Sequence, residues 1–123
     1  MKLWPIFLLL LLAQQSLPGQ EVAAGSEQER RGEAALADGL WEVAEQHFRG
    51  CLAGTALAPA TKSRIAVRLA ESLIRAGNSV EALELLAQSF VAENPETPFW
   101  KAHALTGQHR FTEAAALFSA TND

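Results

Sequence analysis

The chain has 123 residues, with 10 Lys and Arg against 14 Asp and Glu, and its formal net charge at pH 7 is −4. This length allows one small domain. The mildly acidic charge argues against nucleic-acid binding, which needs a basic surface. Because Cys51 is the only cysteine in the chain, no internal disulfide can form and packing alone must hold the fold.

The N-terminal segment has the order of a secretory signal peptide. Lys2 is followed by an apolar run over residues 3–13 and then by polar residues that end in small ones. The run is shorter than the roughly 20 residues that a membrane-spanning helix needs. We therefore expect residues 1–24 to be cleaved off and the mature chain, 25–123, to be secreted or periplasmic with no membrane span. A retained apolar anchor is the alternative.

The rest of the chain has the apolar periodicity of helices. Apolar residues recur three and four positions apart, and no alternating run of β-branched residues indicates a strand. Pro59 and Pro98 stand where a first-turn proline would, and Gly39 and Gly77 stand where helices end. The sequence predicts an all-α fold of three antiparallel hairpins, with helices over 26–38, 41–53, 60–76, 79–92, 98–107 and 111–120.

One spacing recurs in all three hairpins. Each has a turn residue, a small residue five positions later and a large apolar residue four positions after that. These residues are Gly39, Ala44 and Phe48; Gly77, Ala82 and Leu86; and His109, Ala114 and Phe118. Equal side-chain sizes at equal intervals are what stacked copies of a two-helix unit need, because each copy presents the same face to the next.

At these residues the chain resembles the tetratricopeptide repeat (TPR) family, whose 34-residue pattern has alanine followed four positions later by phenylalanine. The units span about 25–58, 59–94 and 95–123. The resemblance implies an α-solenoid, a right-handed superhelical stack of the three hairpins. It also implies that Trp41 and Phe111, just after two of the turns, pack in the core rather than stack on a ligand. An ordinary helical bundle is the alternative.

The sequence gives no pattern that carries catalysis or metal binding. His47 and Cys51 share one helix face, but two ligands do not make a zinc site. No nucleophile elbow, glycine-rich phosphate loop or Cys–His–Asn arrangement occurs. We therefore expect no enzyme activity, no metal and no cofactor.

The resemblance implies a concave groove lined by the first helix of each hairpin. In this chain those helices bring acids from 26–38, an arginine-rich face from 60–76 and aromatic residues from 98–107. The candidate binding residues are Glu29, Glu33, Arg64, Val67, Arg68, Glu71, Arg75, Phe99, Trp100 and His103. We expect the two acids of the first helix to pair with the arginines. A merely solvated face is the alternative.

These features predict a non-enzymatic protein–protein interaction module, a TPR scaffold or adaptor that docks a peptide or a partner helix in the groove. The alternative is an assembly subunit, or a shortened member of a longer helical solenoid, which works through its C-terminal end face. On that face Leu117 and Phe118 are large apolar residues, and an uncovered apolar face favours self-association through them.

Overall fold

The structure is a computed structural model that describes residues 18–54 and 56–121. In those residues every regular element is a helix, which confirms the all-α prediction. The helices are α2 (Pro18–Ala37), α3 (Trp41–Ala53), α4 (Pro59–Arg75), α5 (Ser79–Leu86), α6 (Ser89–Ala92), α7 (Thr97–Gly107) and α8 (Phe111–Thr121). None of them is both long enough and apolar enough to cross a lipid bilayer. Most of the predicted signal peptide lies outside the described residues.

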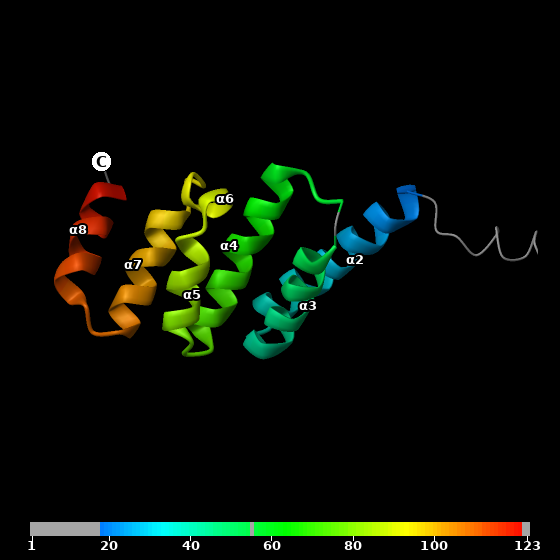
Figure 1. Ribbon diagram of the computed structural model, residues 1–123. Coiled ribbons are helices and arrows are strands. Elements are labelled where there is room, and N and C mark those ends of the chain that lie inside the picture. The colour runs from blue at the N-terminus through cyan, green and yellow to red at the C-terminus, as the bar shows by residue number, and fades with distance from the viewer. Residues whose placement is uncertain (1–17, 55, 122–123) are drawn as a thin grey trace, which may run out of the picture.

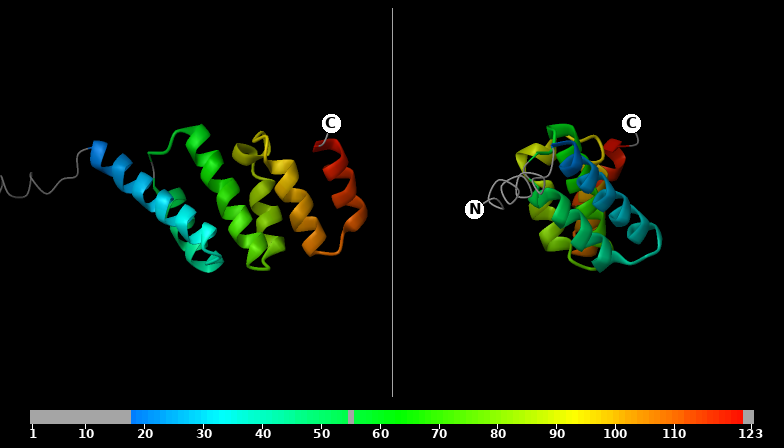
Figure 2. Two further views of the ribbon diagram at one scale, coloured as in Figure 1. Left: turned by 180° about the vertical axis from the view of Figure 1, so that it is seen from behind. Right: turned by 90° about the vertical axis from the view of Figure 1, so that its right-hand side faces the viewer.

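The helices stand side by side in a row that follows the order of the chain, from α2 at one end to α8 at the other (Figures 1 and 2). Three antiparallel pairs make up the row: α2 with α3, α4 with α5, and α7 with α8. Neighbouring pairs meet where α3 packs on α4 and α5 packs on α7, and the first helices also contact one another, α2 with α4 and α4 with α7.

The three hairpin turns have the same backbone structure. The turn residues have positive φ angles, 77° at Gly39, 91° at Gly77 and 60° at His109. After each of them, the next N–H donates to the carbonyl five residues back: Leu40 to Ala35 at 2.8 Å, Asn78 to Leu73 at 2.7 Å and Arg110 to Leu105 at 2.9 Å. This is the Schellman ending of a helix, and it lies at the three turn positions that the sequence spacing predicts.

The repeated apolar positions form the interior of the row. Ala44, Ala82 and Ala114 are all buried, and Phe48 and Leu86 are buried with them. Phe118 is only partly buried, because α8 is the last helix of the row and no element of the described chain covers its outer side.

Two expectations about the helices are wrong in detail. The first helix begins at Pro18, so it runs through the expected cleavage position. The predicted helix 79–92 is two helices, because Gln88 has an extended ψ of 141°. The break lets Val91 enter the core completely buried and places the Phe90 ring 4.5 Å from Lys62 Nζ.

The expectation that both residues after the turns pack in the core is wrong for Phe111. Phe111 is 58% exposed, because it lies at the outer end of the row, where no following hairpin covers it. Trp41 is partly buried and packs against the core cluster.

Candidate docking face

The candidate binding residues lie on α2, α4 and α7, the first helices of the three hairpins. We call the surface that carries them the docking face. Its members are Glu29 and Glu33 on α2; Arg64, Arg68, Glu71 and Arg75 on α4; Glu96 at the start of α7; and Phe99, Trp100 and His103 on α7. The four residues of α4 share one side of that helix because they recur at intervals of three and four positions.

Ion pairs cross the docking face from helix to helix. Arg64 donates from Nε and Nη2 to Glu29 Oε1 at 2.9 and 2.7 Å, which joins α4 to α2. Arg68 donates from Nη2 to Glu96 Oε1 at 2.5 Å, which joins α4 to α7. The expected pairing of Glu29 with an arginine is present.

Glu71 is the buried centre of this network. Its Oε1 accepts a hydrogen bond from Arg68 Nη1 at 2.5 Å, and its Oε2 accepts one from Arg75 Nε at 3.0 Å. A buried carboxylate needs such partners, and here the two arginines supply one hydrogen bond to each oxygen of Glu71.

Glu33 is close to this network but makes no hydrogen bond or ion pair within the described part of the chain. Its side chain is exposed, but its pKa is raised, first because the protein around it removes part of the water from the carboxyl group. The Glu29 and Glu71 carboxylates raise the pKa further, and Arg68 and Arg64 oppose the shift. The expected pairing of Glu33 with an arginine is therefore absent.

The α7 end of the docking face is aromatic. The centre of the Phe99 ring lies 5.1 Å from that of Trp100, 4.6 Å from that of His103 and 6.1 Å from that of Phe118. Each pair of rings has an edge-to-face arrangement. Trp100 is only 7% exposed, whereas Phe99 is 41% exposed. Phe99 is therefore the aromatic side chain that this end of the face offers to a partner.

Two guanidinium groups of α4 lie over Trp100. The central carbons of Arg68 and Arg75 are 5.8 and 5.7 Å from the indole centre, within the range of cation–π attraction. Arg75 also lies 5.2 Å from the Trp41 ring, so its side chain stands between tryptophans of the first and third hairpins.

One predicted member of the docking face, Val67, lies elsewhere, and one member of the face was not predicted. Val67 has no exposed surface and belongs to the core cluster, so it does not line a groove. Glu96 was missed. The spacing of charges on α4 gives no sign of Glu96, because its contact with Arg68 depends on how α7 begins beside α4.

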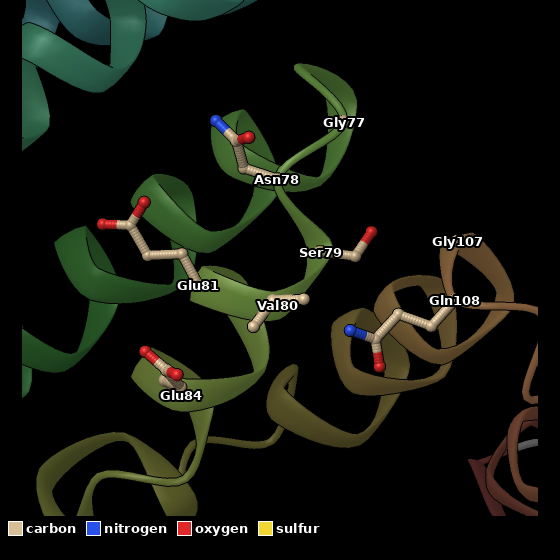
Figure 3. Close-up of a pocket in the computed structure, with 8 residues that line it drawn as sticks. All are labelled: Gly77, Asn78, Ser79, Val80, Glu81, Glu84, Gly107 and Gln108. Atoms are coloured by element: carbon tan, nitrogen blue, oxygen red, sulfur yellow. The ribbon is translucent and has the colours of Figure 1, made fainter.

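A hollow lies at the turn edge of the row, between the start of α5 and the end of α7 (Figure 3). It is wide and has a volume of about 510 Å³. Its lining residues are Gly77, Asn78, Ser79, Val80, Glu81, Glu84, Gly107 and Gln108. Glu81 is engaged by Arg49 of α3 at 2.5 Å. Sequence reasoning missed this hollow, because its residues come from two turns that only the packing brings together.

In the part of the chain that the structure describes, no three His, Cys, Asp or Glu side chains gather as a metal site would require. The chain matches no family model, no curated protein and no solved structure.

Proposed function

We propose that this protein is a non-enzymatic interaction module, built as a TPR-like right-handed stack of three hairpins, that docks a segment of a protein partner on the α2–α4–α7 face. Two features support the stacking: the three turns share one backbone geometry, and the small residue of each repeat is buried in every unit. The docked segment is a peptide or a helix that lies across the first helices.

The observation that carries the docking role is the exposed Phe99 at the end of a row of charged groups. Phe99 is 41% exposed and its ring lies against Trp100, over which Arg68 and Arg75 lie, while Arg64 and Arg75 are exposed further along α4. An exposed aromatic side chain and arginines on one surface are the composition typical of the energetic centre of protein interfaces. The ion pairs fix the three helices relative to one another, so the face is preorganised for binding.

A selection from a displayed peptide library, followed by affinity measurement on variants, tests this role. Arg64→Gln with Phe99→Ser changes two exposed groups of the docking face. Arg68 is left intact because its loss would leave Glu71 short of a partner. We expect the selected peptides to lose about tenfold or more in affinity.

The matched control is Val80→Ser with Glu84→Gln, which alters the turn-edge hollow instead. This variant keeps the affinity if the docking face is the binding site. Equal affinity of the wild type and the docking-face variant, or loss only in the control variant, contradicts the proposal.

We also propose that the protein works outside the cytoplasm, in the periplasm or the exterior. The support is the order of the N-terminal residues alone, a basic residue, an apolar run and then small residues. N-terminal sequencing of the protein recovered from the exported fraction tests the proposal, and the expected first residue is Gly25. An uncleaved N-terminus contradicts it.

Self-association through α8 is a second candidate function, favoured by the exposure of Phe111. The expected role of Phe118 in that contact is weaker, because its ring lies against Phe99 and His103 within the third hairpin. Sedimentation equilibrium of the wild type and Phe111→Ser tests this function. It predicts oligomers that dissociate in the variant, and a wild type that is monomeric throughout the concentration range contradicts it.

A further inference from the structure

The indole N–H of Trp100 is buried and has no hydrogen-bond acceptor in the described part of the chain. The Trp100 ring lies in the seam between α4 and α7. Buried donors in folded proteins are almost always paired, because an unpaired one costs free energy. This N–H therefore calls for an acceptor that the described chain does not supply.

Arg75 brings further unused donors to the same place. Its Nε bonds to Glu71, but its two terminal nitrogens make no hydrogen bond within residues 18–54 and 56–121. The guanidinium centre lies 5.7 Å from the Trp100 ring, and 45% of the side-chain surface is exposed. Since Nε1 of Trp100 has no exposed surface, a ligand reaches it only if neighbouring side chains move, and the exposed Arg75 side chain has room to change rotamer.

We propose that the seam between Arg75 and Trp100 binds a carboxylate side chain, Asp or Glu, of the docked partner. Two terminal guanidinium nitrogens form a planar fork that fits the two oxygens of a carboxylate, and the indole N–H donates to one of those oxygens. This inference rests on the proposed function, because it names what the docked segment carries at one position.

The charges around the seam favour an anion over a cation. Arg68 and Arg75 both lie over the indole. Glu71 is buried and committed to these two arginines, and Glu96 is exposed at the far side of Arg68. A cationic side chain at Trp100 would meet two guanidinium groups, whereas a carboxylate would meet the terminal nitrogens of Arg75, which make no hydrogen bond in the described part of the chain.

NMR of the full chain tests the inference through the indole proton of Trp100. The chain has 3 tryptophans, and Trp4→Phe and Trp41→Phe assign their three indole signals. The probes are N-acetyl-glutamate amide, with a side-chain acid; N-acetyl-glutamine, with a terminal acid only; and N-acetyl-glutamine amide, which has no acid. The first probe is expected to move the Trp100 signal downfield and to bind with a Kd on the order of millimolar.

Variants separate binding from stability. Arg75→Gln should weaken binding of the first probe by about tenfold or more, whereas Arg110→Gln, which removes an exposed and ion-paired arginine outside the docking face, should leave it unchanged. Trp100→Phe keeps an aromatic ring but removes the N–H. This variant should lose binding, measured on backbone amides, while its unfolding temperature stays the same or rises.

Several results would overturn the inference. One is no movement of the indole signal with the side-chain acid, and another is equal movement with the uncharged probe. Stronger binding of the terminal acid would overturn the assignment to a side chain. If Arg75→Gln or Trp100→Phe binds the first probe as well as the wild type does, the replaced residue is not a donor to the carboxylate. If these tests fail while the displayed peptides still require Phe99, the carboxylate site alone is wrong and the docking role stands.

Discussion

Phe48 occupies the space that a side chain at Gly32 would need. A Cβ atom built on Gly32 would lie 2.8 Å from Cε1 and 2.9 Å from Cζ of the Phe48 ring. Phe48 is completely buried, so its ring has little room to move. The glycine therefore lets α2 and α3 approach closely around a large aromatic side chain. At the same interval of sixteen residues, the second unit has Ala70 and Leu86, a larger residue opposite a smaller one.

This relationship predicts that the effect of Gly32→Ala on the free energy of unfolding changes sign when Phe48 is replaced by leucine. Gly32→Ala alone should lower the free energy of unfolding by about 1–2 kcal/mol, because overpacking costs more than the roughly 1 kcal/mol that alanine gains over glycine in a helix. In a Phe48→Leu background, which copies the second unit, the same substitution should stabilise the protein. Urea unfolding of the four proteins measures the cycle. The same effect of Gly32→Ala in both backgrounds would show that the ring does not exclude the side chain.

The turns predict opposite responses at equivalent positions. A Cβ at Gly77 would meet no atom within 4 Å, so Gly77→Ala should cost about 1–2 kcal/mol solely because φ is 91°. His109 already holds a side chain at a φ of 60°. His109→Gly should therefore leave the free energy of unfolding unchanged or raise it by up to about 1 kcal/mol. Thermal unfolding checks both, and a destabilised His109→Gly would mean that the third turn is not equivalent to the second.

The repeat spacing predicted the turns and the small interior residues, because these features depend on local backbone and on size. Gly39, Gly77 and His109 have the left-handed backbone expected at their positions, and the buried alanines follow at constant intervals. Such features can be seen in a single sequence because each unit provides an independent copy of the same pattern.

Other features could not be predicted, because they depend on contacts between units. Val67 stands beside arginines in the sequence, and only the packing of α4 shows that it faces the core. The break at Gln88 has no glycine or proline to mark it, and it follows from the burial of Val91. The position of Arg75 between Trp41 and Trp100 joins residues from three hairpins, and no local spacing connects them.

The buried Glu71 should matter more to stability than the equally charged Glu29. Glu71 accepts hydrogen bonds from two arginines, so Glu71→Gln should lower the free energy of unfolding by about 1.5–3 kcal/mol. The pair of Glu29 with the exposed Arg64 should contribute less than about 1 kcal/mol, so Glu29→Gln is the control. Urea unfolding of both variants at the same salt concentration gives the comparison. Equal losses would mean that burial of the network has no energetic effect.

The raised pKa of Glu33 makes stability depend on pH in a defined direction. Desolvation is the main cause, and Glu29 and Glu71 add to it against Arg68 and Arg64. The ionised carboxyl therefore destabilises the folded state, a penalty that is complete above the raised pKa and disappears as pH falls toward the ordinary value of 4.5.

Glu33→Gln should accordingly unfold at a higher temperature than the wild type at pH 7, and the difference should disappear below pH 4. Thermal unfolding over a pH series measures this difference. A variant that is less stable than the wild type at pH 7 would mean that Glu33 gains more from the arginines than it loses by desolvation.

Amide chemical-shift mapping with a peptide selected against the protein tests the central claim most directly. If the first helices dock the partner, the largest shifts should fall on residues around Arg64, Phe99 and His103, and the turn edge around Val80 and Gln108 should stay unchanged. Shifts centred on Val80, Glu84 and Gln108, with none on α4 or α7, would contradict the account.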